Sequence, residues 1–171
     1  MNTLCEQLHE IRHGRVCLVG VGNVELGDDG FGVRLAETLR AAGVVRHEWR
    51  VLVAGCEPER CLAELSGDGL DRVIFLDAVE FGGEPGAVVL LGASEMLTRF
   101  PQISTHKISL GLLARMIEAD GTTKAWLLGV QPESLRPGTG LSPRVQASAD
   151  VLSELLAEDV SARTFQTALP C

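Results

Sequence analysis

Five apolar segments rich in β-branched residues recur along the chain and predict five strands. Most of them are apolar without interruption, which is typical of strands buried on both faces of a sheet. They cover Val16–Val21, Arg50–Ala54, Arg72–Ala78, Ala87–Leu91 and Ala125–Val130. Four other segments carry apolar residues at three- and four-residue spacing, which predicts helices. These cover Gly30–Ala42, Pro58–Leu65, Ser109–Ala119 and Ser142–Ala157.

The order of these elements, β-α-β-α-β-β-α-β-α, predicts an α/β fold with three layers. A twisted, mostly parallel five-stranded sheet would lie between two layers of helices. The short loop FGGEPG leads into the Ala87–Leu91 strand, so we expect that strand to be antiparallel at an edge. With 171 residues, 46% of them hydrophobic, we expect a single domain. Its core would span residues 15–160, between an N-terminal extension (1–14) and a C-terminal tail (161–171).

Composition and charge narrow the class of partner. The chain has 15 basic and 23 acidic residues, a net charge of −8, and its basic residues are scattered, so we expect no nucleic-acid binding. No apolar run reaches the roughly 18–20 residues that span a bilayer, and the N-terminus lacks the apolar core of a signal peptide. We therefore expect a cytoplasmic monomer without a membrane partner.

The five cysteines are an odd number and form no C-x-x-C pair. This pattern favours reduced thiols in a reducing compartment over a disulfide framework. Cys56 and Cys61 are separated by four residues and have no histidine nearby. Structural or incidental thiols are therefore preferred over metal ligands.

The segment GVGNVELGDDGFGVRLAETL joins the first predicted strand to the first predicted helix. A helix N-terminus ordinarily attracts anions, but here Glu25, Asp28 and Asp29 supply negative charge, and no Lys or Arg lies between Gly20 and Gly32. The dinucleotide motif G-x-G-x-x-G fails because its third glycine would be Glu25, and no Gly-Lys-Ser/Thr of a P-loop follows. The segment is therefore suited to a cation and not to a phosphate.

Chain order gathers three chemically active residues at one edge of the predicted sheet. In open α/β sheets, functional groups lie outside the carboxyl ends of the strands, where the strand order reverses. Asp29 follows the first strand and Asp77 ends the third, and a 2-1-3 strand order would make these strands neighbours. His106, just before a helix, is placed to return to the same edge. Two carboxylates and an imidazole would suit a divalent transition metal.

Each residue also has a simpler interpretation. Asp28 is expected to be the N-cap of the helix that begins at Gly30, and Asn23 is expected to stabilise the turn through bonds to the backbone. Asp29 alone would be a first-turn acid, and His106 alone a loop histidine. Asp77 favours function, because an unpaired buried carboxylate is costly.

The segment HEIRH, with His9, Glu10 and His13, matches the zinc-protease pattern H-E-x-x-H. That pattern requires a helix embedded in a folded domain, a third ligand downstream and a cleft across the helix. This segment precedes the first strand and ends at Gly14. We therefore do not assign it a catalytic role.

Four ordered blocks of the chain resemble the hydrogenase maturation endopeptidases. They are GVGNVELGDDGFGVRLAE, VIFLDAVEFGGEPG, THKISLGLLARMI and GVQPESLRPGTGLSPRVQASADVL. The resemblance implies a twisted α/β sheet and cleavage of a short C-terminal extension from the nickel-loaded large-subunit precursor of a nickel–iron hydrogenase. It does not cover the residues before Arg15 or the tail from Ser161 to Cys171.

Carried over by motif, the resemblance implies that Asp29, Asp77 and His106 contact the metal and carry catalysis. Nickel would be brought by the substrate, and other divalent metals could bind in vitro. The supporting loop residues would be Gly22, Asn23, Asp28, Gly30 and Cys56. Cys56 departs from the pattern, because relatives often carry a second glycine there.

Two mechanisms and two other functions stay open at this point. The metal could polarise the peptide carbonyl and activate a bound water, or an aspartate could drive hydrolysis as general base without a catalytic metal. A nickel-sensing chaperone that binds the precursor without cutting it would use the same site, and a small-molecule hydrolase or nucleotide-binding protein rests on fold analogy alone. Substrate choice is expected in the loops Gly55–Arg60, Phe81–Gly86 and Gln131–Leu141.

Overall fold

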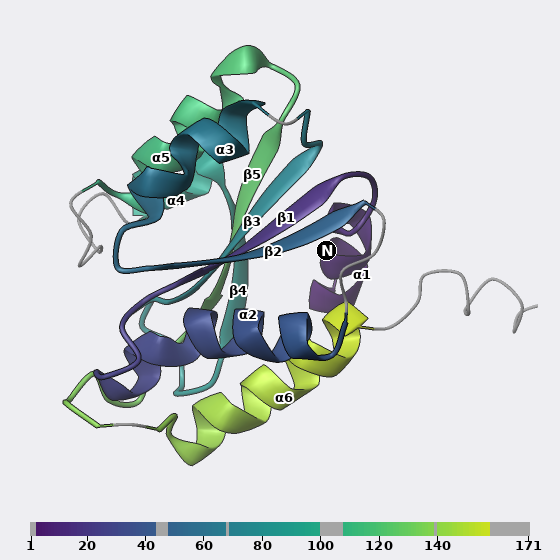
Figure 1. The fold of residues 1–171 in the computed structure, drawn as a ribbon. Helices are drawn as coiled ribbons and strands as arrows, with labels where there is room; N and C mark the ends of the chain where they lie inside the picture. Colours follow the sequence, from purple (N-terminus) through teal and green to yellow (C-terminus); the bar gives the residue numbers. More distant parts are fainter. Residues whose placement is uncertain (1–2, 44–47, 68, 100–107, 139, 158–171) are drawn as a thin grey trace, which may run out of the picture.

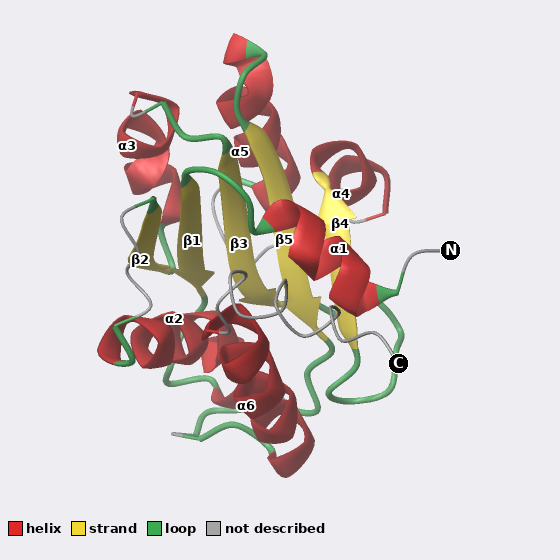
Figure 2. Ribbon diagram, turned by 90° about the vertical axis from the view of Figure 1, so that its right-hand side faces the viewer, coloured by secondary structure: helices red, strands yellow, loops and turns green. Residues whose placement is uncertain are grey.

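A computed structural model describes residues 3–43, 48–67, 69–99, 108–138 and 140–157 of the chain. Within them, five strands form one sheet in the order β2-β1-β3-β5-β4, and Figure 2 shows these strands side by side between helices. The predicted α/β class, the mostly parallel sheet and the neighbouring first and third strands are confirmed.

The strands lie close to the predicted segments. β1 (Val16–Val21) pairs in parallel with β2 (Trp49–Gly55) on one side and with β3 (Arg72–Ala78) on the other. β5 (Lys124–Val130) pairs in parallel with β3, and β4 (Val88–Gly92) is the antiparallel edge strand. β5 therefore lies between β3 and the strand that follows β3 in sequence.

One face of the sheet is covered by α1 (Leu4–Ile11), α2 (Phe31–Ala41) and α6 (Pro143–Ala157), which Figure 1 places below and to the right of the strands. Val16 and Leu18 of β1 point to this face. The buried helix residues here are Leu8, Ile11, Phe31, Leu35, Ala36, Leu39, Val145, Ala149, Leu152 and Leu156. Because α1 buries Leu8 and Ile11, the packed core begins before residue 15, contrary to the prediction.

The other face is covered by α3 (Leu62–Gly67), α4 (Ala93–Arg99) and α5 (Leu110–Ile117). Alternate residues of β1, among them Cys17 and Val19, point to this face. The buried helix residues here are Leu65, Ala93, Met96, Leu110, Leu113, Ala114 and Ile117. Each central strand therefore buries both of its faces, which explains why the strand segments are continuously apolar.

The helix boundaries refine the predicted ones. Short 3₁₀ turns precede or follow three of the predicted helices: η1 (Gly27–Gly30) before α2, η2 (Pro58–Cys61) before α3, and η3 (Glu118–Asp120) after α5. Ser109 caps α5 by accepting a hydrogen bond from the Leu112 N–H at 3.3 Å. α1 and α4 were not predicted from the sequence.

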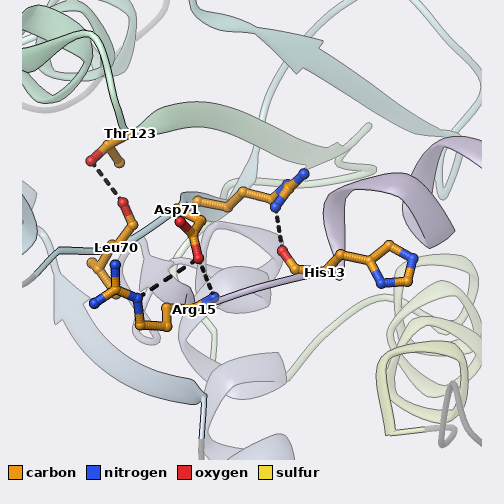
Figure 3. Close-up of polar contacts among 6 residues, drawn as sticks. His13, Arg15, Leu70, Asp71 and Thr123 are labelled. Carbon is orange, nitrogen blue, oxygen red and sulfur yellow. Dashed lines mark hydrogen bonds and ion pairs between the residues drawn. The ribbon is translucent and has the colours of Figure 1, made fainter.

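Polar contacts tie together the amino ends of the parallel strands, far from the edge where Asp77 lies. Figure 3 shows the Asp71 carboxylate accepting from the Arg15 N–H at 2.7 Å and the Thr123 hydroxyl donating to the Leu70 carbonyl at 2.9 Å. Arg72 donates to the His13 carbonyl. The connection between α1 and β1 is therefore anchored to the start of β3.

None of the helices in the described part of the chain is long and apolar enough to cross a membrane.

Candidate active site

Three neighbouring strands end at one edge of the sheet, and each brings a candidate residue there. Cys56 follows β2, Asp29 lies in η1 after β1, and Asp77 is the last residue but one of β3. Because these strands are adjacent and parallel in the order β2-β1-β3, their carboxyl ends meet at the point where the chain leaves β1. This is the position at which open α/β sheets bind ligands.

Gly22 lies between the two aspartates. Its φ of +119° suits glycine, and a side-chain carbon built on it would lie 1.8 Å from the Asp29 carbonyl oxygen and 3.7 Å from Asp77 Oδ1. No other amino acid fits at this point, because the Asp29 backbone already fills the space. Gly22 therefore allows η1 to approach β3 closely and brings Asp29 to the side of Asp77.

Asp29 is 6% exposed and is held by the turn before it. Its Oδ2 accepts a hydrogen bond from the Asn23 N–H at 2.7 Å. The Asn23 side chain accepts from the Glu25 N–H at 2.9 Å, which confirms its predicted role in the turn. A side-chain carbon on Gly30 would lie 2.9 Å from Val24 Cα, so the same turn also packs against the start of α2.

Asp77 is 5% exposed although it ends an apolar strand. Its Oδ1 accepts a hydrogen bond from the Ala78 N–H at 2.9 Å. Two buried carboxylates beside one glycine concentrate negative charge at this edge, and burial of such charge favours binding of a cation.

Cys56 is exposed at the mouth of this site, and its Sγ lies 3.8 Å from the Gly22 carbonyl oxygen, to which it donates. Partial burial of the sulfur, followed by the negative charges of Asp29, Glu57, Asp77 and Glu25, raises the pKa of the Cys56 thiol. The thiol therefore stays protonated at neutral pH and is close enough to sense the charge of both aspartates.

The prediction that Asp28 caps the following helix is wrong. The N-cap of α2 is Gly30, which has no side-chain capping bond. Asp28 is 1% exposed and turns instead toward the segment before α6. Its Oδ2 accepts from the Glu133 and Ser134 N–H groups and the Ser142 hydroxyl at 2.8, 3.0 and 2.9 Å, and its Oδ1 accepts from the Ser142 N–H at 2.6 Å. The loop before α6 therefore supplies the hydrogen-bond donors of Asp28, and the N-terminus of α2 does not.

These four bonds set the charge state of Asp28. Burial, the largest single effect, would by itself raise the pKa of the Asp28 carboxyl. The hydrogen bonds from Ser142, Ser134 and Glu133 together outweigh it, so the pKa of Asp28 is lowered below its ordinary value. Asp28 is therefore ionised at neutral pH and is a structural anion beside Asp29.

Gln131 joins two of the loops in which substrate choice is expected. It is 9% exposed, and its Oε1 accepts from the Phe81 N–H at 2.9 Å and from the Gly83 N–H at 3.1 Å. It thereby fixes the loop after β3 to the end of β5. Its contacts with Phe81 and Gly83 were not predicted, and the available sequence signal was a polar glutamine directly after an apolar strand and before Pro132.

The third predicted ligand, His106, lies outside the described residues, so its place relative to the aspartates stays a prediction. Among the residues that the structure describes, no three His, Cys, Asp or Glu side chains come together in a group able to hold a metal ion. Among the described residues, Cys5, Cys17, Cys56 and Cys61 form no disulfide.

Comparison with known proteins shows the family of the chain. The family model described as hydrogenase maturation protease matches residues 33–159. The chain belongs to the hydrogenase maturation protease family. It is 32% identical to the Hydrogenase 2 maturation protease of Escherichia coli strain K12 over 148 residues, which cover 84% of this chain and 89% of the relative.

Solved structures of hydrogenase maturation proteases share the fold. The [NiFe] hydrogenase maturation protease HycI from Thermococcus kodakarensis KOD1 superposes with a TM-score of 0.77 at 31% identity, covering 88% of this chain and 96% of that one. The hydrogenase maturating endopeptidase HybD from E. coli superposes with a TM-score of 0.69 at 30% identity, covering 82% and 88%. This maturation protease is therefore a hydrolase, as predicted.

The HEIRH segment is remote from the aspartates of this maturation protease. Its helix α1 ends at Ile11, so His13 lies beyond it, and the rings of His9 and His13 meet edge to face with centroids 5.0 Å apart. His13 is fixed to Arg72, which lies five residues before Asp77 on β3, or about 17 Å along the strand. A cavity of about 280 Å³ beside α1, lined in part by Glu10, Arg72 and Trp126, lies at this same far edge.

Proposed function

We propose that this protein is an endopeptidase that removes a C-terminal extension from the nickel-loaded large-subunit precursor of a nickel–iron hydrogenase. The observation that carries the proposal is the pair of buried carboxylates, Asp29 and Asp77, brought together by Gly22 at the carboxyl ends of β1 and β3. Membership of the hydrogenase maturation protease family and the [NiFe] hydrogenase named for a structural neighbour supply the class of substrate.

In this proposal the nickel belongs to the substrate, and Asp29, Asp77 and His106 bind it. Carboxylate oxygens and an imidazole nitrogen form a donor set that suits a first-row divalent metal. An ionised carboxylate has about four acceptor positions, so the bond from the Asn23 N–H to Asp29 leaves capacity for a metal. Binding of the nickel then orients the neighbouring peptide bond in the site, and recognition and cleavage become linked.

Hydrolysis requires a water to attack the scissile carbonyl carbon, a base to take its proton, and the leaving amine to gain one. A carboxylate oxygen of Asp29 or Asp77 that does not contact the nickel takes the proton of the water and passes it to the leaving amine. The charge of the substrate's nickel near the carbonyl polarises it and lowers the pKa of a bound water to about 7. The route that relies on the aspartates alone uses the same residues without this second contribution.

The proposal is tested by the intact mass of a large-subunit precursor after incubation with this protein, with and without nickel loaded. We expect loss of a C-terminal peptide only from the nickel-loaded precursor. Asp29→Ala should abolish this loss, whereas Glu37→Ala, which removes an exposed carboxylate on α2, should cleave like the wild type. Cleavage that persists with nickel dependence in Asp77→Asn or His106→Ala would contradict the site.

A second function would give a different result in the same experiment. If several nickel-loaded precursors bind tightly and none is cut, the protein is a nickel-sensing chaperone of the immature large subunit. Full nickel-dependent binding without product distinguishes this case from a precursor that the enzyme does not recognise.

A further inference from the structure

Asp28 connects the loop that carries Asp29 to a second loop that lies more than a hundred residues away in sequence. The Asp28 carboxylate accepts hydrogen bonds from Glu133, Ser134 and Ser142, at distances of 2.6 to 3.0 Å. Bonds of backbone N–H and hydroxyl groups to an ionised carboxylate are stronger than bonds between neutral groups. We call residues 133–138 and 140–142 the latched loop.

The backbones of the two loops are also joined. Gly27 N–H donates to the Gly138 carbonyl at 3.0 Å, Asp28 N–H donates to the Ser134 carbonyl at 3.0 Å, and Gly138 N–H donates to the Glu25 carbonyl at 2.9 Å. A side-chain carbon on Gly27 would lie 2.9 Å from the Ser134 carbonyl oxygen, so the loops are packed without space between them. Figure 1 shows the latched loop, in green, alongside the start of α2.

The latched loop is held at its start by a separate contact. Gln131 accepts from the Phe81 and Gly83 N–H groups and exchanges backbone bonds with Gly86 and Ala87. The chain just before the latched loop is therefore fixed without Asp28. The loop itself, where residues 133–138 are exposed to solvent, is held by the backbone bonds to residues 25–28 and by the carboxylate of Asp28.

We propose that Asp28 is a positioning residue, which holds the latched loop beside the aspartate pair as a wall of the substrate site that contacts the precursor next to its scissile bond. The inference rests on the proposed function. Its physical basis is that Asp28 and Asp29 are adjacent in η1. Asp29 lies at the site and Asp28 is bonded to the latched loop, so the conformation of this one turn sets the position of both side chains. The exposed side chains of the latched loop are then presented to the precursor at a fixed distance from the reacting bond.

The variant Asp28→Asn tests the inference, because an amide keeps the shape but has one acceptor oxygen where the carboxylate has two. We expect its KM for the nickel-loaded precursor to rise about tenfold, which corresponds to about 1.4 kcal/mol, with a smaller change in kcat. Ser142→Ala, which removes one donor, should raise KM less, and Ser142→Thr, which keeps the hydroxyl, should restore it. Asp71→Asn is the matched control, since Asp71 is also bonded to a backbone N–H but at the far edge of the sheet.

Hydrogen–deuterium exchange of the free enzyme supplies a readout that does not depend on cleavage. In Asp28→Asn, the amides of residues 133–138 should exchange faster by a larger factor than those of β1 and β3, whose rates change only with the global stability of the fold. An acceleration at residues 133–138 no greater than that in β1 and β3, or a KM within twofold of the wild type, would overturn the inference. Absence of cleavage by the wild type would instead count against the proposed function, and the exchange result would still decide whether Asp28 holds the loop.

Discussion

Asp28 and Asp29 are adjacent aspartates, both buried, and their roles differ because their partners differ. Asp28 accepts four hydrogen bonds from a distant loop, whereas Asp29 accepts one from the Asn23 N–H and lies beside Asp77 across Gly22. A carboxylate whose acceptor positions are filled by the protein is a structural group. One that retains acceptor positions at a strand edge is suited to bind a cation.

Asp28 should make the stability of the protein depend on acid pH. Because the pKa of Asp28 is lowered in the folded state, its contribution is present above the ordinary carboxyl value of about 4 and is lost as the pH falls through the folded value. At pH 7, Asp28→Asn should reduce the free energy of unfolding by about 2–4 kcal/mol, because several buried N–H groups lose an ionised acceptor. Urea unfolding at pH 7 and at lower pH should show the two proteins converging in acid.

An equal stability difference between Asp28→Asn and wild type from pH 7 to pH 3 would contradict this prediction. Asp71→Asn is the control for this comparison, because it removes a carboxylate that is about half exposed and not buried like that of Asp28.

Cys56 can report the charge of the aspartate pair. Burial and then the charge of Asp29 raise the pKa of the Cys56 thiol, and only the thiolate is alkylated. Asp29→Asn removes one of these charges, so Cys56 should react faster with iodoacetamide at pH 7.5 relative to the exposed Cys5. Peptide mass spectrometry gives both rates in one sample, and an unchanged ratio would place Cys56 farther from Asp29 than the structure does.

Asp28, Asp29 and Asp77 differ in how much of their role the sequence alone predicts. The placement of Asp29 and Asp77 at the same edge of the sheet was predictable, because the chain order makes the first and third strands neighbours, and a carboxylate at the end of an apolar strand, as Asp77 is, is costly to bury unpaired. The role of Asp28 was not, because an N-cap and an anchor for a distant loop have the same local sequence. Only the fold brings Ser142 and Glu133 to Asp28.

At the scale of elements, α2 packs unusually close to the sheet. A side-chain carbon on Gly32 would lie 1.8 Å from the Leu76 carbonyl oxygen and 2.5 Å from that of Val21, and one on Gly20 would lie 2.6 Å from Ala36 Cβ. These glycines let the backbone of α2 approach β1 and β3, and this approach brings η1, with Asp29, to the carboxyl ends of those strands.

Gly32→Ala should therefore destabilise the protein by about 3 kcal/mol, the upper part of the usual range for overpacking. The atoms that it meets belong to the backbone of β3 and cannot rotate away. Gly92→Ala is the matched control, because nothing lies within 4 Å of its added carbon and alanine is favoured over glycine in a strand by up to about 1 kcal/mol. The midpoints of urea unfolding compare the two, and similar midpoints would contradict the close packing.

The elements that the sequence predicted are those with a long or strongly apolar signal. All five strands are apolar on both faces, and the predicted helices present a continuous apolar stripe. α4 was missed because it has seven residues, buries only Ala93 and Met96, and follows β4 without a turn residue between them. α1 carried a readable signal in its capping box, Thr3 with Glu6, although it is a short helix that precedes the first strand.

At the scale of the whole molecule, the sheet separates two groups of polar residues at opposite ends of its strands. Asp29, Asp77 and Cys56 lie at the carboxyl ends, and Asp71 with Arg15 lies at the amino ends, as Figure 3 shows. Because the interior of the sheet between them is apolar and close-packed, the two groups do not share a ligand. The first is suited to chemistry, and the second joins the ends of strands.

This separation predicts that the histidines of HEIRH are dispensable for cleavage. The double variant His9→Ala/His13→Ala removes two rings that contact each other but leaves Leu8 and Ile11, the residues of α1 that pack in the core. We expect kcat/KM for the nickel-loaded precursor to stay within about twofold of the wild type, because the backbone of His13 is bonded to Arg72, which lies about 17 Å of strand away from Asp77. Leu8→Ala, by contrast, should destabilise the fold by about 2–5 kcal/mol, so the two variants separate the packing of α1 from its histidines. A large loss of cleavage in the histidine variant, with an unchanged unfolding midpoint, would place catalysis at the amino ends of the strands and overturn the assignment of Asp29 and Asp77.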